Sequence, residues 1–259
     1  MSNIKYKLLC LIMCVIMNPA YSTADSAGTL KTNGNTIIDS QTNKPIPNAK
    51  IFLPKENYYT YTDADGNFAL DAKIDHQTIM SVEKDGYRPY SITIDKSSAE
   101  KPMVMGIEKS KVEDIVLDAE ILHLGDDNFS ENSANSGEFK VKSIGPFYTK
   151  TFKMTADTLS RINYLVIGSI IGVDTKMARS LGQNKVVHSY ASPAEVFFNG
   201  NKISEIHLNG DGQRIKLPNN LIRPGNTNEI TIKTGKNLMQ TAYVDYDDIE
   251  IMNLSIQSE

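Results

Sequence analysis

The chain has 259 residues, a formal net charge of −4, two cysteines and no tryptophan. Its hydrophobic content of 40% and charged content of 22% are those of a globular protein and exclude a disordered or membrane-embedded chain. The acidic balance argues against nucleic acid as a partner, because phosphate binding needs a positive surface. The length suffices for one large domain or for two domains with separate cores.

The N-terminal segment has the pattern of a secretory signal peptide, which we assign to residues 1–24. Lys5 and Lys7 precede the apolar run Leu8–Met17, and small residues before position 25 allow cleavage. A run of about ten residues is too short to span a bilayer. We therefore predict a secreted or periplasmic bacterial protein with no transmembrane segment after cleavage, whose mature chain begins with a flexible leader at residues 25–35.

Both cysteines, Cys10 and Cys14, lie in this segment. The alternative is a lipoprotein signal with Cys14 as the lipidated residue, but Leu11–Met13 lacks the small residue expected just before such a cysteine. Cleavage after Ala24 leaves no thiol for disulfides, thiolate catalysis or cysteine-based zinc sites. We expect packing, with or without a metal ion, to hold the mature fold.

The first half of the mature chain, residues 36–120, is predicted to be a β-sandwich, because short strand-like runs alternate with turn signals at regular intervals. The predicted strands are Thr36–Asp39, Ala49–Leu53, Asn67–Leu70, Thr78–Glu83, Tyr90–Ile94 and Val112–Leu117. Lys96–Ser110 is polar and is predicted to be a long surface loop. Asp63–Asn67 starts like an EF-hand loop, but Phe68 replaces the required glycine, so we predict a hairpin turn there.

Residues 121–259 are predicted to form a second β-sandwich, so the fold class is all-β with two sandwiches in series. The predicted strands are Phe139–Lys142, Lys150–Met154, Tyr164–Val173, Ala194–Phe198, Gln213–Leu217, Glu229–Lys233 and Asp248–Ile256. Asn199-Gly200 predicts a type I′ hairpin, and Thr155–Arg161 a short helical turn. Apolar residues change parity within the last strand, which indicates a β-bulge or burial on both faces.

Four stretches of the first half share a family pattern: Gly34–Asp39, Thr42–Ile51, Thr62–Phe68 and Lys84–Tyr87. Together they resemble the signatures of carboxypeptidase regulatory-like domains, over about residues 30–118. The resemblance implies a transthyretin-like sandwich without catalytic residues, which serves as a spacer or folding companion.

The second half has a different resemblance, carried by His123–Phe129, Phe197–Ile203, Leu221–Ile232 and Asp245–Ile251. These stretches are similar to galactose-binding-like jelly rolls, the fold of many carbohydrate-binding modules. The resemblance implies carbohydrate as the ligand and a structural calcium ion. The two domains in this order also resemble the non-catalytic half of rhamnogalacturonan lyases, but no lyase domain is present in this sequence.

Sugar-binding modules stack sugar rings on tryptophan or tyrosine, so tyrosines are the candidates in this chain. We assign the ligand-binding role to Tyr148, Tyr190, Tyr243 and Tyr246. Tyr58, Tyr59 and Tyr61 are further candidates in the first domain. The alternative for each is a half-buried packing residue with its hydroxyl group in water.

Two acidic clusters are the candidate metal site, because calcium prefers oxygen ligands. In a jelly roll the loop before the first strand lies beside the last strand, so one ion could bridge both clusters. The predicted ligands are Asp126, Asp127, Asp245, Asp247 and Asp248. Strand alternation places Asp248 on the opposite face from Asp245 and Asp247. The alternative is a solvated acidic edge that opposes aggregation.

No catalytic constellation emerges from the sequence. His76, His123, His188 and His207 lack the spacing of zinc ligands, and the sequence has no nucleophile elbow, phosphate loop or dinucleotide fingerprint. We therefore predict a non-enzymatic binding protein for extracellular or cell-surface carbohydrate. The alternative is a protein-interaction component, such as an adhesin, matrix protein or secretion-associated factor. An enzyme would need a deep pocket with paired carboxylates or a histidine.

Overall fold

The computed structural model describes residues 34–128, 139–184, 190–239 and 242–259. The predicted signal peptide and all but the end of the predicted leader lie outside these residues. The described chain forms four β-sheets with only short helices, which confirms the predicted all-β class. No helix in these ranges combines the length and apolarity needed to cross a bilayer.

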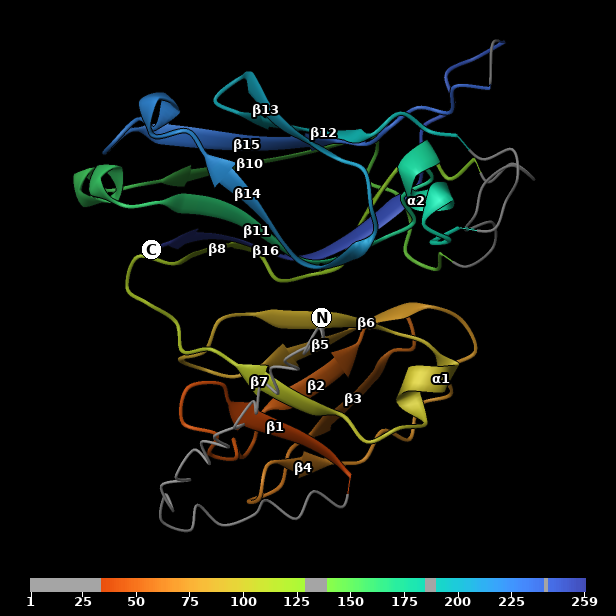
Figure 1. Ribbon diagram of the computed structural model, residues 1–259, viewed down its shortest axis with the longest axis vertical. Coiled ribbons are helices and arrows are strands. Elements are labelled where there is room, and N and C mark those ends of the chain that lie inside the picture. Colours follow the sequence, from red (N-terminus) through yellow and green to blue (C-terminus); the bar gives the residue numbers. More distant parts are fainter. Residues whose placement is uncertain (1–33, 129–138, 185–189, 240–241) are drawn as a thin grey trace, which may run out of the picture. The chain divides into compact units, whose positions relative to one another are not determined.

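The first sandwich consists of a three-stranded sheet and a four-stranded sheet (Figure 1). The three-stranded sheet has the order β4 (Asn67–Phe68), β1 (Asn35–Asp39), β7 (Val104–Ile107). The four-stranded sheet has the order β3 (Tyr58–Tyr61), β2 (Lys50–Leu53), β5 (Thr78–Glu83), β6 (Tyr90–Ile94). The helix α1 (Lys96–Ala99) follows β6 and is capped by Asp95. Inward side chains of both sheets, such as Ile37, Ile51 and Val82, share one core.

The second sandwich pairs a four-stranded sheet with a five-stranded sheet. The four-stranded sheet has the order β10 (Phe147–Lys153), β15 (Thr227–Lys233), β12 (Ala194–Phe198), β13 (Asn201–Ile206). The other has the order β14 (Gly210–Leu217), β11 (Asn163–Ile171), β16 (Ile249–Ser258), β8 (Ile115–Asp118), and β9 (Leu122–Leu124) also pairs with β16. The connections include the 3-10 helices Ala156–Ser160 and Asn219–Leu221 and the helix α2 (Lys176–Ser180).

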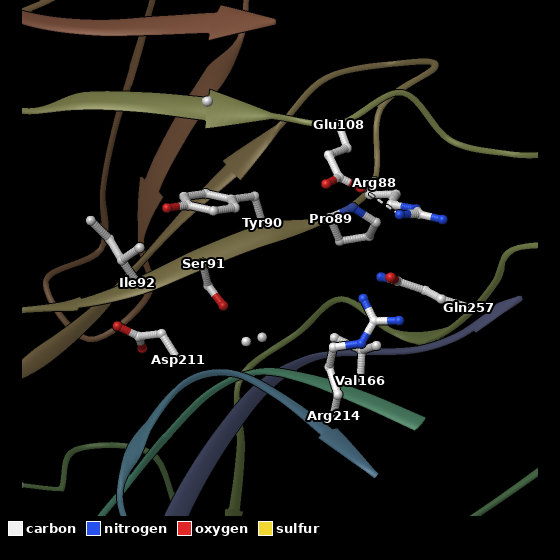
Figure 2. Close-up of a pocket in the computed structure, with 13 residues that line it drawn as sticks. Arg88, Pro89, Tyr90, Ser91, Ile92, Glu108, Val166, Asp211, Arg214 and Gln257 are labelled. Carbon is white, nitrogen blue, oxygen red and sulfur yellow. Dashed lines mark hydrogen bonds and ion pairs between the residues drawn. The ribbon is translucent and has the colours of Figure 1, made fainter. Parts of the chain in front are cut away.

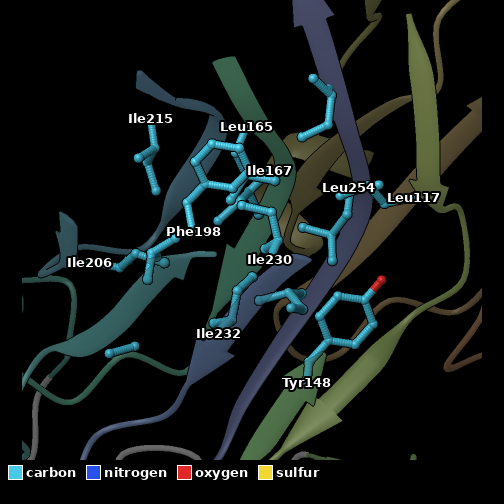
Figure 3. Packing of buried hydrophobic residues seen from close by; sticks show 14 of the residues in the cluster. Leu117, Tyr148, Leu165, Ile167, Phe198, Ile206, Ile215, Ile230, Ile232 and Leu254 are labelled. Atoms are coloured by element: carbon cyan, nitrogen blue, oxygen red, sulfur yellow. The ribbon is translucent and has the colours of Figure 1, made fainter. Parts of the chain in front are cut away.

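The core of the second sandwich lies between these two sheets (Figure 3). Phe198, Ile230 and Ile232 come from one sheet, and Leu165 and Leu254 come from the other, all without solvent exposure. Alternation along β12 and β15 buries every second residue, as expected for strands with one covered face. Burial of this apolar surface supplies the main driving force for folding.

Several local predictions are confirmed. Asn199 and Gly200 have φ values of 50° and 81°, the left-handed pair that a type I′ hairpin requires. The Asp63 carboxylate accepts hydrogen bonds from the backbone N–H groups of Asp65 and Asn67, at 3.0 and 2.8 Å, so this acidic motif is a turn. The predicted helical turn after β10 is a 3-10 helix.

Three strand assignments differ from the sequence prediction. The segment predicted as a loop contains β7, which pairs in parallel with β1 because Met105 and Ile107 alternate into the first core. The predicted last strand of the first sandwich is β8, which pairs with β16 in the second sandwich, where Leu117 is buried. Phe139–Lys142 is not a strand; the sheet instead begins with β10.

The ten residues of β16 are all buried. Ile249, Ile251 and Leu254 face the second core, whereas Met252 contacts Ile79 of β5 in the first sandwich. The change of parity falls between Ile251 and Leu254, at the left-handed Asn253 with φ of 58°, and the pairing with β8 shifts register just after it, between Leu254 and Ser255. The sequence predicted either a bulge or two-sided burial, and the burial on both faces is confirmed.

An ion pair lies within the contact between the sandwiches. Lys55 Nζ is 3.2 Å from Glu250 Oε2, and neither side chain has any exposed surface. Lys55 also donates to the Gln77 carbonyl at 3.4 Å. Burial raises the pKa of Glu250, and the neighbouring Lys55 ammonium opposes that rise. Each charge in this dry contact therefore depends on its partner.

We predict that Lys55→Met lowers the free energy of unfolding by about 3–5 kcal/mol, because it leaves Glu250 buried without its counter-charge. The double variant Lys55→Met/Glu250→Met removes both charges and should recover most of this loss. Urea denaturation of the wild type and both variants measures the effect. Equal stability of Lys55→Met and the wild type would contradict the prediction.

Candidate functional site

The two predicted acidic clusters lie next to each other. β9 pairs with the start of β16, with Leu124 opposite Ile249, so the loop after β9 runs beside the segment before β16. Asp126 Oδ2 accepts a hydrogen bond from the Tyr246 backbone N–H at 3.1 Å, and the Asp127 N–H donates to Asp248 Oδ1 at 3.1 Å. The pairing of β9 with β16 thus explains why acids far apart in sequence share one region.

Gly125 makes this approach possible. Its φ of +155° lies at the edge of the range that side chains rarely adopt, and a Cβ atom there would lie 1.9 Å from Asp248 Oδ1. The Ser143 hydroxyl donates to the Gly125 carbonyl at 2.9 Å and fixes the loop from its other side. A side chain at position 125 would therefore displace the Asp248 carboxylate.

His123 is buried at the centre of this region and bonds through both ring nitrogens. Nδ1 donates to the Val141 carbonyl at 2.6 Å, and Nε2 lies 2.9 Å from Asp248 Oδ1. Asp127 Oδ1 is 3.6 Å from Nδ1. Ligand atoms of His123, Asp127 and Asp248 all lie within 4.8 Å of one another, as metal ligands would.

The hydrogen bonds nevertheless favour a cationic histidine over a metal ligand. A carbonyl oxygen and an ionised carboxylate only accept, so both ring nitrogens must carry protons to satisfy Val141 and Asp248. Burial lowers the pKa of His123, but its hydrogen bonds to Asp248 and Val141 outweigh that effect and raise the pKa overall. An imidazolium has no lone pair for a metal, so His123 itself is the cation that balances Asp127 and Asp248.

Burial and mutual repulsion raise the pKa values of two other acids in this region, Asp245 and Asp247. Burial raises the pKa of Asp245, although an Asn237 side-chain N–H donates to it at 3.0 Å. Burial, and then repulsion from Asp174, raises the pKa of Asp247 well above its usual value. Asp247 Oδ2 accepts from the Asp174 backbone N–H at 3.1 Å, whereas Asp248 bonds to His123.

Asp174 was missed by sequence reasoning. It follows β11 and is buried, and the Asn184 amide donates to its carboxylate at 3.3 Å. Asn184 Oδ1 is buried without a hydrogen-bond partner among the described residues. The sequence did show an acid directly after a long apolar strand, which could have marked Asp174 as a candidate. A single sequence does not show that this end of the strand meets Asp247.

Three of the four predicted ligand tyrosines lie beside this acidic region. The Tyr190 carbonyl accepts from the Leu238 N–H at 2.8 Å, and the Arg179 guanidinium lies 4.2 Å from the Tyr190 ring centroid. Tyr246 pairs with Lys236 in an isolated bridge, and Tyr243 is 52% exposed. The three tyrosines therefore belong to segments connected by hydrogen bonds at one end of the second sandwich.

Tyr148 lies elsewhere. Its ring is in the core of the second sandwich, and its hydroxyl group donates to Asp118 at 3.4 Å (Figure 3). Burial raises its pKa strongly. A ring covered on both faces offers no platform for a sugar, so we leave Tyr148 out of the candidate ligand surface. Its hydrophobic neighbours explain the difference, because alternation along β10 turns this position inward.

The first-domain tyrosines differ among themselves. The Tyr58 hydroxyl group donates to the Ala69 carbonyl at 3.1 Å, so this residue has a structural role. Tyr59 and Tyr61 are 62% and 54% exposed. Their rings meet edge to face at 79°, which is not the coplanar strip expected of a sugar platform.

We predict that His123 makes the fold less stable as pH rises. A raised folded-state pKa gives stability that is complete below the unfolded value of about 6.5 and is lost as pH rises through the folded value. Urea denaturation between about pH 6 and pH 9 should therefore show a steeper loss for the wild type than for His123→Gln. Parallel pH profiles would contradict an imidazolium at this position.

Comparisons with known proteins identify the first sandwich only. Residues 34–117 match the family of the CarboxypepD_reg-like domain, a non-catalytic domain type, which confirms the first resemblance. No curated protein matches. A glycosyl hydrolase family 2 member from Bacteroides cellulosilyticus is similar over 55% of this chain and 21% of that chain, with 10% identity and a TM-score of 0.30. A similarity this weak decides nothing about the second sandwich.

Proposed function

We propose that the chain is a secreted, non-catalytic protein that binds carbohydrate at the end of the second sandwich bearing Tyr190, Tyr243 and Tyr246. The observation that carries the proposal is the link between the acidic segment and these tyrosines, of which Tyr243 is exposed and Tyr190 and Tyr246 are half-buried. Tyr246 directly precedes Asp247 and Asp248, Tyr243 lies two residues before Asp245, and the Asp126 carboxylate accepts a hydrogen bond from the Tyr246 backbone. A site that fixes this segment also fixes the aromatic surface that would meet a sugar.

Calcium is the ion that suits this segment. Asp126, Asp245 and Asp247 offer oxygen ligands, as calcium requires. Asp127 and Asp248 already balance His123, whereas burial raises the pKa values of Asp245 and Asp247. A divalent cation would relieve this crowding and hold both carboxylates ionised.

We predict that calcium stabilises the protein. At a free concentration of about a hundred times Kd, calcium should raise the unfolding free energy by about 3 kcal/mol and the melting temperature by roughly 5–10 °C. Scanning fluorimetry measures the melting temperature in EGTA and in excess calcium. Asp126→Asn/Asp245→Asn should lose the response, whereas the control Asp65→Asn, in the turn of the first sandwich, should keep it. No calcium response in the wild type would refute the site.

The glycan proposal has its own test. On an array of bacterial and plant polysaccharides, the wild type should bind at least one class, and Tyr243→Ala/Tyr246→Ala should reduce that binding by tenfold or more, because stacking on aromatic rings is lost. Tyr59→Ala is the matched control, an exposed tyrosine on the first sandwich that should bind like the wild type. Binding that the double variant retains would place the ligand elsewhere.

A protein-interaction role is the second candidate, favoured by apolar side chains beside the same tyrosines. Leu238, Met239 and Val244 are 65%, 55% and 55% exposed. Neighbouring exposed apolar groups are typical of surfaces that contact proteins. Two results together would favour this role. The glycan array would be negative, and the wild type would capture a defined surface protein that the double variant Leu238→Ser/Val244→Ser does not capture.

A further inference from the structure

A cavity of about 320 Å³ lies away from the tyrosines, where β6 and β7 meet β11, β14 and β16 (Figure 2). Its volume is at the small end of the roughly 300–1,000 Å³ typical of ligand sites. Neither sequence reasoning nor the comparisons point to it, because its walls come from both sandwiches. Gly168 lets β11 approach closely, since a Cβ atom there would lie 2.5 Å from Ser91 Oγ.

One wall of the cavity is fixed by Asp211. Its carboxylate accepts from the Thr93 N–H at 3.0 Å, from the Thr93 hydroxyl group at 2.8 Å and from the Ser169 hydroxyl group at 2.7 Å. These bonds tie β14 to β6 and β11. The carboxylate is therefore a structural group that holds the cavity open in a defined shape.

The opposite wall is fixed by Arg88. It donates to both carboxylate oxygens of Asp114, at 2.7 and 3.1 Å, and to Glu108 at 2.5 Å. Such a bidentate pair holds the guanidinium rigidly. A cavity whose polar walls are already hydrogen-bonded requires little reorganisation when a ligand enters.

Donor and acceptor groups face the space between these walls. The Arg214 guanidinium lies 4.2 Å from the Tyr164 ring centroid and donates through Nη2 to Glu259. This hydrogen bond does not use its Nε and Nη1 groups. In Figure 2 Arg214 and Gln257 both point toward the centre of the cavity. Gln257 donates through Nε2 to the Ser255 hydroxyl group at 3.2 Å, which leaves its carbonyl oxygen as an acceptor.

The apolar part of the lining comes from Tyr90, Pro89 and Val166. Burial, and then the nearby Asp211 carboxylate, raises the pKa of Tyr90, so its hydroxyl group stays protonated and can donate. The charged lining residues are two arginines and two acids, Arg88 and Arg214 with Glu108 and Asp211. The lining therefore has no net charge and favours a neutral ligand over an anion or a cation.

We infer that this cavity binds a neutral sugar ring between Tyr90 and Val166, with hydroxyl groups on Arg214 and Gln257. A sugar ring combines these two requirements, and the volume admits one or two rings. The inference rests on the proposed carbohydrate function and adds a second site, a partly open cavity, to the tyrosine surface. The sugar comes either as a free molecule or as the end of a glycan chain.

Saturation-transfer NMR on the purified protein tests the site with galactose, rhamnose, glucose and N-acetylglucosamine, each as free sugar and as methyl glycoside. At least one neutral sugar should bind. Sugar binding should be tenfold weaker or more in Arg214→Ala and in the cavity-filling variant Val166→Phe. The control Lys216→Ala changes a residue two positions along the same face of β14 and should leave sugar binding unchanged. Binding of the glycoside identifies a chain end, and binding of the free sugar alone identifies a free sugar.

Three results would overturn the inference: no binding of any of these sugars, binding unchanged in both cavity variants, or preferential binding of the charged comparator galacturonate. A positive glycan array with no effect of the cavity variants would reject this site and leave the proposed function standing. A negative array with no sugar binding would reject both. Circular dichroism of each variant confirms that a loss of binding is not a loss of fold.

Discussion

The burial of β16 on both faces is the constraint on which the rest of the structure depends. One face completes the core of the second sandwich, and the other carries Met252, Glu250 and Asn253 toward the first sandwich. Polar side chains on this buried face depend on partners within the protein, although Glu250 Oε1 and Oε2 and Asn253 Oδ1 have no hydrogen bond among the described residues. Lys55 therefore pairs with Glu250, and the Asn253 amide donates to the Ser81 hydroxyl group at 3.2 Å.

The same strand positions both candidate ligand regions. Its N-terminal end continues from the acidic segment and pairs with β9, which brings His123 against Asp248. Its C-terminal end carries Gln257 into the cavity beside Arg214. The proposed calcium segment and the proposed sugar cavity are thus attached to one rigid element, although they lie at opposite ends of it.

Local features were predictable from the sequence, and long-range pairings were not. The Asn199-Gly200 hairpin and the parity change within β16 follow from backbone preference and side-chain alternation over a few residues. The role of His123 and the cavity at Arg214 depend on segments far apart in the chain. β8 was assigned to the wrong sandwich because a short apolar strand does not reveal its partner, and Tyr148 was placed on the surface because an isolated tyrosine in a strand suits either face.

The most direct test of two-sided burial is differential scanning calorimetry of the chain without residues 1–24. If β16 unites the sandwiches, residues 32–259 form one compact unit and should melt in a single transition whose calorimetric and van't Hoff enthalpies agree. Two resolved transitions, each with the enthalpy of one sandwich, would contradict the claim. They would show that the buried face of β16 contributes little to the stability of the first sandwich.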